Sequence, residues 1–263
     1  MDAQRRGERP LIEASESPTI PPWSPDDGVR RVLMVTAHPD DVDFGSAGTV
    51  AAFTSAGLDV TYCVATNGDA GGSDLEMARA DMAALRQEEQ RAAAAVVGVS
   101  DVRFLGHPDG AVEPTLALRR DISRVIREVR PERVVTQSPE RNWGFIFASH
   151  PDHLALGEAA VCAVYPDARN PFAHVELLRD EGLEPWTVPE LWIMGPGDRR
   201  ASIAVETTAT VDRKVTALLC HKSQIPDPEG LTTRILEGAR MQAELAGLPE
   251  GSSAELFRVT RIP

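Results

Sequence analysis

The sequence predicts an α/β fold, with a doubly wound and mostly parallel β-sheet that carries helices on both faces. Continuous apolar, β-branched runs such as residues 32–37 are typical of strands that are buried on both faces. These runs alternate along the chain with helical stretches, which is the pattern of consecutive βαβ units. At about 100–200 residues per domain, a length of 263 residues predicts one large domain or two small ones, enough to bury a sizeable core.

The first half of the chain contains four predicted strands with helices between them. Glycine or proline marks the end of each of these helices, at Gly57, at Gly98 and before Pro131. The stretch Leu116–Arg130 has its apolar residues at helical spacing, so it predicts an amphipathic helix. The predicted strands are Val32–Ala37, Leu58–Gly68, Val102–Gly106 and Arg133–Gln137.

The second half of the chain predicts a smaller β/α extension of this sheet. Its strands are predicted at Leu191–Gly195 and Ala201–Thr210, and the stretch Pro166–Pro189 resembles a loop. Residues 1–28 are rich in proline, serine and charge, which predicts a tail or a surface strap before a single domain of residues 29–263. The predicted helices of this half are His153–Tyr165, Asp212–His221 and Glu229–Leu245.

Composition disfavours several classes of function. The chain has 27 Lys and Arg against 40 Asp and Glu, a net charge of −13, which disfavours nucleic acids and anionic membranes as partners. No apolar run approaches the ~20 residues of a membrane span, and the N-terminal segment has no secretory pattern. The three cysteines, Cys63, Cys162 and Cys220, form no CxxC motif and predict free thiols. We therefore expect a cytoplasmic protein.

Two His-Pro-Asp motifs are the strongest chemical signal in the sequence. The segment 37–41 reads AHPDD directly after the first predicted strand, and the segment 149–153 reads SHPDH beyond the fourth. Ligands of doubly wound sheets bind beyond the carboxyl ends of the strands, so we expect the two motifs to meet. His38 and Asp41 can face one ion across a turn that proline fixes, and His153 offers a third ligand.

This residue set predicts a catalytic metal site. Two histidines and a carboxylate with an open fourth position suit Zn²⁺, and Fe²⁺ or another divalent metal would also fit. Asp40 would take a proton from a metal-activated water, and His150 would stabilise the oxyanion or protonate the leaving amine. Asp152 would orient His150, as carboxylates commonly orient imidazoles. The alternative is two unrelated turns, because proline and aspartate both favour turns for local reasons.

The paired motifs AHPDD and HPDH resemble those of the PIG-L (LmbE-like) de-N-acetylase family, over about residues 31–224. The family includes deacetylases of the mycothiol pathway and of antibiotic amino sugars. The resemblance implies that His38, Asp41 and His153 bind zinc and that Asp40 is the general base. It also implies that His150 assists the tetrahedral intermediate with support from Asp152.

Weaker motifs extend the resemblance and imply residues that bind substrate. Arg86 begins a segment similar to a family helix whose arginine contacts a sugar hydroxyl, and Asp109 lies in a turn whose aspartate faces the sugar. A third His-Pro-Asp motif, which begins at His107, has no second acid or imidazole beside it and predicts a turn. One departure is Ala148, where some relatives carry a tyrosine that assists catalysis.

The resemblance implies a zinc-dependent hydrolase that removes an acetyl group from the amide nitrogen of an N-acetylglucosamine-type sugar conjugate. One alternative is a metal-dependent amidase that acts on a different amide, such as a mycothiol S-conjugate. Another is a non-catalytic sugar-binding protein of the same fold, which the presence of Asp40 disfavours. The fold is Rossmann-like, but its first crossover carries no GxGxxG motif, so a dinucleotide is not the expected ligand. The expected partner is a small amino-sugar conjugate, and homo-oligomerisation stays open.

Overall fold

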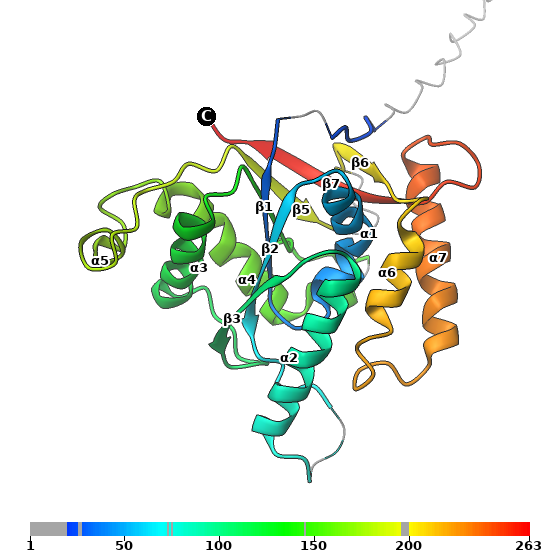
Figure 1. Cartoon of the computed structure of the whole chain (residues 1–263), viewed down its shortest axis with the longest axis horizontal. Helices are drawn as coiled ribbons and strands as arrows, with labels where there is room; N and C mark the ends of the chain where they lie inside the picture. Colours follow the sequence, from blue (N-terminus) through cyan, green and yellow to red (C-terminus); the bar gives the residue numbers. More distant parts are fainter. Residues whose placement is uncertain (1–19, 26–27, 73, 75, 145, 196–199) are drawn as a thin grey trace, which may run out of the picture.

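A seven-stranded sheet with the strand order β3-β2-β1-β4-β5-β7-β6 runs through the middle of the molecule (Figure 1). The structure is a computed structural model that describes residues 20–25, 28–72, 74, 76–144, 146–195 and 200–263. The first five strands in this order pair in parallel, and β7 pairs antiparallel with β5 and β6, so the predicted α/β class is confirmed. The strands are β1 (Arg31–Thr36), β2 (Asp59–Thr66), β3 (Asp101–His107), β4 (Arg133–Thr136), β5 (Glu190–Met194), β6 (Ile203–Glu206) and β7 (Ala254–Arg261).

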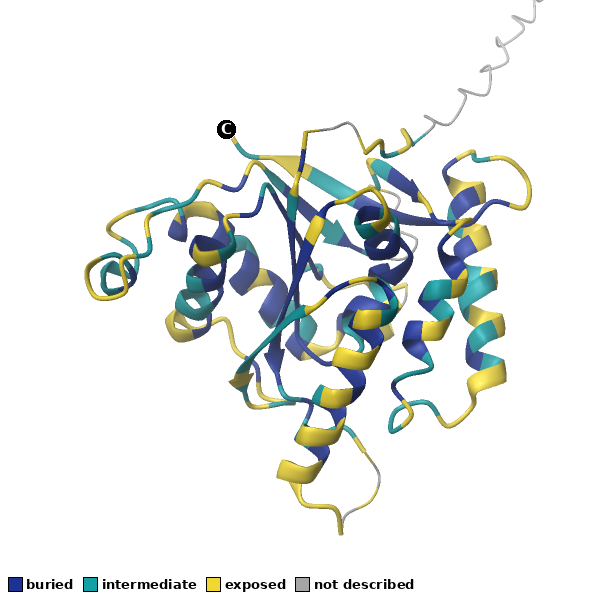
Figure 2. Cartoon of the chain, in the orientation of Figure 1, coloured by how far each residue is buried: buried dark blue, intermediate teal, exposed yellow. Residues whose placement is uncertain are grey.

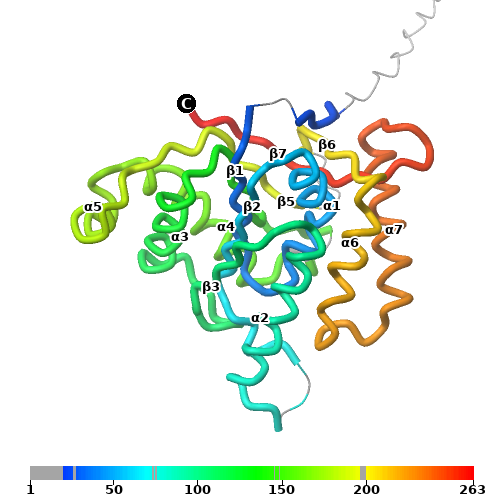
Figure 3. The backbone as a smooth tube through the Cα atoms, viewed as in Figure 1, coloured from blue at the N-terminus to red at the C-terminus, as the bar shows by residue number. Residues whose placement is uncertain are grey.

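Helices cover both faces of the sheet, as a doubly wound fold requires. Figure 3 shows α1 beside α6, although the two helices are far apart in the sequence. On this face lie α1 (Asp41–Ser55), α2 (Arg79–Val96), α6 (Val211–Leu218) and α7 (Pro228–Leu245). The other face carries α3 (Leu116–Val129), α4 (Pro151–Cys162), the short π-helix η2 (Ala163–Asp167) and α5 (Val175–Arg179).

The alternating side chains of β1 connect the two helical layers. Val32 and Met34 belong to the hydrophobic core under α1 and α2, whereas Leu33 and Val35 belong to the core under α3 and α4. All four side chains are fully buried, which explains the continuous apolar run in the sequence. Figure 2 shows the result, with buried strands in the centre and helices that are exposed only on their outer sides.

The last strand, β7, is absent from the sequence-based prediction. It enters the sheet between β5 and β6, and its first half is buried while its second half is partly exposed. Glu255 interrupts the apolar pattern there because it is buried as a charged partner of Lys214. A smaller difference concerns a helix: α5 lies within the stretch expected to be a loop.

Part of the predicted N-terminal tail contacts the edge of the sheet. The backbone N–H of Trp23 donates to Ala204 O of β6 at 2.7 Å, and the Trp23 ring packs edge-on against Phe53 at 4.9 Å. Residues 1–19 and 26–27 of this tail lie outside the described residues. Within the described part of the chain, no helix is both long and apolar enough to span a bilayer, and all three cysteines are free thiols.

Candidate metal centre and active site

The two His-Pro-Asp motifs meet at the carboxyl ends of β1 and β4. These strands are parallel neighbours, with Val35 of β1 opposite Thr136 of β4, so both end at the same edge of the sheet. His38 follows β1 after one residue, and His153 lies in the first turn of α4, which follows the loop after β4. The His38 Nδ1 and His153 Nε2 atoms are 3.2 Å apart, which brings the two motifs into direct contact.

The three residues expected to hold a metal form a compact set. Asp41 Oδ1 lies 3.0 Å from His153 Nε2, and Asp41 Oδ2 lies 3.4 Å from His38 Nδ1. A tetrahedral zinc ion with bonds of about 2.0–2.1 Å to nitrogen or oxygen keeps neighbouring ligand atoms about 3.3–3.4 Å apart. The spacing and the chemistry of these three side chains therefore fit a divalent cation.

The second nitrogen of His38 is held by two carboxylates. His38 Nε2 lies 3.1 Å from Asp152 Oδ2 and 3.2 Å from Asp109 Oδ1, which makes it the hydrogen-bond donor and leaves Nδ1 for an ion. Burial lowers the pKa of His38, but the carboxylates of Asp109 and Asp41 outweigh this and raise it to about 11. A cation bound at Nδ1 would replace the proton that this environment favours.

Asp152 contacts a different histidine from the one expected. Its carboxylate lies against His38 and accepts the backbone N–H groups of Gly110 at 2.8 Å and Val112 at 3.3 Å. His150 instead accepts the backbone N–H of Asp152 at its Nδ1 atom, at 3.2 Å, as the N-cap of α4. The carboxylate of Asp152 therefore orients the expected metal ligand His38, because the two backbone amides turn it away from the His150 ring.

Asp40 occupies a strained position at the start of α1. Its φ angle is 99°, a left-handed conformation that a residue other than glycine rarely adopts outside functional sites. Burial and the negative charge of Asp41 raise the pKa of Asp40 to about 7, against the opposing charge of Arg86. A carboxylate with a pKa near neutrality is suited to take a proton from water and to return it.

Arg86 and Asp109 lie beside Asp40, on the side of the site nearest β2 and β3. The buried guanidinium of Arg86 donates to Asp40 Oδ2 at 3.1 Å and to the carbonyl oxygen of Pro39 at 2.7 Å. Arg86 also lies 3.6 Å from Asp109. Both residues line a cavity of about 330 Å³ that also contains Asp40 and His150. Arg86 therefore positions Asp40, while sugar contact by Arg86 or Asp109 stays a prediction.

His150 presents a neutral ring to the same cavity. Its Nδ1 atom is occupied as an acceptor, so the ring proton resides on Nε2. Burial lowers the pKa of His150, and the neighbouring His38 and His153 lower it further. The ring is thus a neutral hydrogen-bond donor.

Comparisons with known proteins identify the family of this chain. The PIG-L family, described as GlcNAc-PI de-N-acetylase, matches residues 33–164, which include both His-Pro-Asp motifs. The chain belongs to the PIG-L family. The resemblance seen in the sequence is therefore confirmed.

Relatives of this PIG-L chain deacetylate amino sugars, according to their names. Diacetylchitobiose deacetylase of Thermococcus kodakarensis is 30% identical over 203 residues, which cover 77% of this chain and 73% of that protein. The 1D-myo-inositol 2-acetamido-2-deoxy-alpha-D-glucopyranoside deacetylase of Kineococcus radiotolerans is 30% identical. The matched region covers 84% of this chain and 68% of that protein. The solved structure of N,N'-diacetylchitobiose deacetylase from Pyrococcus horikoshii superimposes with a TM-score of 0.80 at 26% identity, covering 90% of this chain and 86% of that one.

Sequence reasoning missed a buried network that supports the site of this PIG-L protein. The Gln90 side chain accepts the Asp40 backbone N–H at 2.7 Å and donates to Asp43 Oδ2 at 2.8 Å. His221 Nε2 lies 2.8 Å from the same Asp43 oxygen, and His221 is fully buried. The signal for Gln90 was its position four residues after Arg86, which places both side chains on one face of α2.

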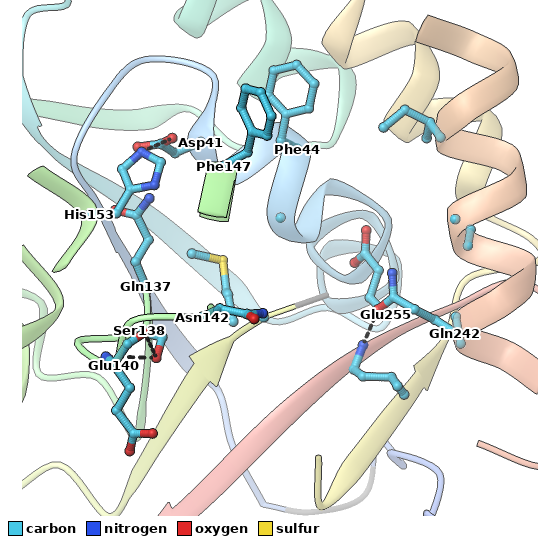
Figure 4. A pocket seen from close by; sticks show the side chains of 18 of the residues that line it. Asp41, Phe44, Gln137, Ser138, Glu140, Asn142, Phe147, His153, Gln242 and Glu255 are labelled. Carbon is cyan, nitrogen blue, oxygen red and sulfur yellow. Dashed lines mark hydrogen bonds and ion pairs between the residues drawn. The ribbon is translucent and has the colours of Figure 1, made fainter. Parts of the chain in front are cut away.

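A second, larger cavity adjoins the residues expected to bind a metal. Its volume is about 910 Å³, and it extends from the expected ligands toward α7 and β7. Figure 4 shows Asp41 and His153 at one end of this cavity and Gln242 with Glu255 at the other. This cavity could not be predicted from the sequence, because its walls come from segments that are distant along the chain.

Proposed function

We propose that this protein is a metal-dependent N-deacetylase that hydrolyses the acetamido group of an N-acetylglucosamine-type sugar conjugate. The observation that carries the proposal is the arrangement of Asp40 beside His38, Asp41 and His153 at one edge of the sheet. The carboxylate of Asp40, as the proton acceptor, and a set of metal-ligating atoms thus line one cavity.

The proposed metal ligands are His38 Nδ1, Asp41 and His153 Nε2. Zn²⁺ fits this mixed nitrogen and oxygen set, and Fe²⁺ would fit it as well. When bound, such a cation would polarise the acetamide carbonyl and acidify a water molecule. Among the described residues, three carboxylates, of Asp40, Asp41 and Asp109, line the cavity with one guanidinium, of Arg86, so the cavity favours a divalent cation.

The side chains around the cavity can complete the hydrolysis. Asp40 accepts a proton from the water that attacks the carbonyl carbon. The Nε2–H group of His150 donates a hydrogen bond to the oxyanion that forms, and keeps its proton. The C–N bond then breaks, and the proton on Asp40 passes to the leaving amine. The products are acetate and a free amino sugar, and Arg86 stabilises the Asp40 carboxylate for the next cycle.

The names of the relatives support the substrate class. One relative acts on diacetylchitobiose and another on an inositol glycoside of 2-acetamido-2-deoxyglucose. These substrates share the acetamido sugar and differ in the group that the sugar carries. We therefore assign the acetamido sugar to the cavity beside Arg86 and Asp109. The group attached to this sugar is the aglycone.

Metal analysis combined with an amine-release assay tests the proposal. The protein is purified without chelator, its zinc and iron are measured by mass spectrometry, and free amine is assayed from N-acetylglucosamine glycosides with and without chelator. Stoichiometric metal and chelator-sensitive amine release are expected. A protein that binds neither zinc nor ferrous iron after reconstitution would contradict the proposal, and bound metal without turnover of any acetamido sugar would favour the amidase alternative.

A further inference from the structure

The large cavity continues directly from the proposed catalytic centre. Asp41, His153 and Phe147 line both this cavity and the smaller one that contains Arg86 and Asp109. The two cavities therefore adjoin at the expected metal ligands Asp41 and His153. A substrate whose sugar lies in the smaller cavity can extend past the ligands into the larger one.

The position of the two cavities along the sheet explains this arrangement. The smaller cavity lies over the carboxyl ends of β1, β2 and β3, whereas the larger one lies over β4 and β5 and reaches α7. Its volume of about 910 Å³ lies within the range of about 300–1,000 Å³ that holds drug-sized ligands. This space is far larger than an acetyl group needs, so it fits the aglycone rather than the acyl group.

The walls of the larger cavity are predominantly apolar. The aromatic and aliphatic side chains come from α1, from the loop after β4, from β5, from α7 and from β7. Figure 4 shows two of them, Phe44 and Phe147, near the end that holds the metal ligands. The main apolar side chains are Phe44, Trp143, Phe147, Met194, Ile235 and Leu256.

The cationic side chains of this cavity already have partners among the described residues. Lys214 pairs with Glu255 at 2.5 Å, and Arg200 pairs with Glu140. In each of these two pairs the carboxylate compensates the positive charge of its partner. The two other cations have weaker contacts: Arg234 lies 3.9 Å from Asp227, and Arg141 lies over the ring of Trp143 at 5.7 Å.

We propose that the larger cavity is the aglycone subsite and that the aglycone is bulky, uncharged and predominantly apolar. The inference rests on the proposed deacetylase function and specifies its substrate. Burial of apolar surface against aromatic and aliphatic walls favours such a group. A small polar polyol would leave the apolar side chains of these walls in contact with water.

Gly238 on α7 offers a direct way to fill the cavity. It lines the cavity, and a side chain added there would meet no atom within 4 Å. The variant Gly238→Trp therefore has room for its Cβ atom and places an indole ring at the cavity, and replacement of a helical glycine does not weaken the helix. The matched control is Met241→Trp, because Met241 lies on the same helix with 61% of its surface exposed.

The experiment compares three acetamido sugars as both anomers: the methyl glycoside, the 2-naphthyl glycoside and the 1-phosphate of N-acetylglucosamine. We expect kcat/KM for the naphthyl glycoside to exceed that for the other two on the order of 10-fold or more. Gly238→Trp should remove this advantage, so that kcat/KM for the naphthyl glycoside falls toward that for the methyl glycoside, whereas Met241→Trp should keep the preference of the wild type.

The outcomes separate this inference from the function on which it rests. Turnover of the methyl glycoside without any preference for the naphthyl glycoside would overturn the aglycone subsite and leave the deacetylase function intact. A preference for the 1-phosphate, or equal losses on both glycosides in Gly238→Trp, would also overturn it. No amine release from any of the three compounds by the metal-loaded enzyme would contradict the deacetylase function itself, and the inference with it.

Discussion

Gln90 holds the backbone of Asp40, with the Gln90 Oε1 atom 2.7 Å from the Asp40 backbone nitrogen across 50 residues of sequence. The bond matters because Asp40 has a φ angle of 99°, a conformation that costs about 1–3 kcal/mol for a residue other than glycine. Gln90 is itself fully buried and donates to Asp43, which fixes the orientation of its amide. The proposed base is thus positioned by its main chain as well as by its carboxylate.

Replacement of Gln90 should impair catalysis more than substrate binding. Gln90→Leu leaves the buried Asp40 N–H without its acceptor, so the turn relaxes and the carboxylate moves. We expect kcat to fall on the order of 10–100-fold while KM and metal content change little. Steady-state kinetics and metal analysis of Gln90→Leu check this, with Gln87→Leu on the same helix as control. An unchanged kcat in Gln90→Leu would show that the turn holds its shape without this bond.

The pH dependence of kcat/KM should report the ionisation of Asp40. Only the carboxylate accepts a proton, so activity should decrease as the pH falls through its pKa. Burial and Asp41 raise this pKa to about 7, and a bound cation would lower it again, which places the acidic limb at or below about pH 7. Asp40→Asn should keep its metal and lose activity by about 10²–10⁴-fold. Full activity in Asp40→Asn would contradict the assignment of the base.

Arg86 should determine the pH at which kcat/KM falls on the acidic side of the profile. Its positive charge lowers the pKa of Asp40, so Arg86→Met should move the acidic limb to higher pH. The control is Arg91→Met, because Arg91 is exposed on the same helix and lies over Phe104 at 5.0 Å. The pH profiles of kcat/KM for the two variants provide the measurement. A limb that stays in place in Arg86→Met would mean that Arg86 acts only through its contacts with backbone carbonyls.

Local chemistry explains what the sequence could predict. The strand–turn motif at His38 is encoded by a buried apolar run followed by proline and two aspartates, so its position at the sheet edge could be inferred without a structure. The contacts of Asp152 could not be inferred from the sequence. Its carboxylate accepts the backbone N–H groups of Gly110 and Val112, which come from a distant loop. The same limit applies to β7, where the buried ion pair of Glu255 with Lys214 conceals a strand pattern.

Loss of His153 should abolish metal binding. His153→Ala removes the nitrogen that lies 3.0 Å from Asp41 and 3.2 Å from His38, so two ligands remain for the ion. We expect metal content to fall to background after dialysis. The control is His107→Ala, which removes the histidine of the third His-Pro-Asp motif; that side chain pairs with Asp121 at 3.1 Å. A full metal complement in His153→Ala would contradict the ligand assignment.

His221 should stabilise the fold through its contact with Asp43. Both side chains are fully buried, so His221→Leu leaves a carboxylate without its cationic partner and should lower the free energy of unfolding by about 3–5 kcal/mol. Adding Asp43→Asn to this variant should recover part of the loss, because an amide carries no charge to be buried unpaired. Urea unfolding of the three proteins provides the measurement, and a loss below about 1 kcal/mol in His221→Leu would show that this pair is not a buried ion pair.

The same pair should make stability depend on pH in a defined direction. Burial lowers the pKa of His221, but the hydrogen bond and the charge of Asp43 outweigh this and raise it. A histidine with a raised pKa in the folded state stabilises the protein fully below its ordinary value of about 6.5, and this contribution is lost as the pH rises through the raised value. The stability difference between the wild type and His221→Leu should therefore be larger at about pH 6 than at about pH 9. An equal difference at both values would mean that His221 is neutral in the folded protein and binds Asp43 only as a hydrogen-bond donor.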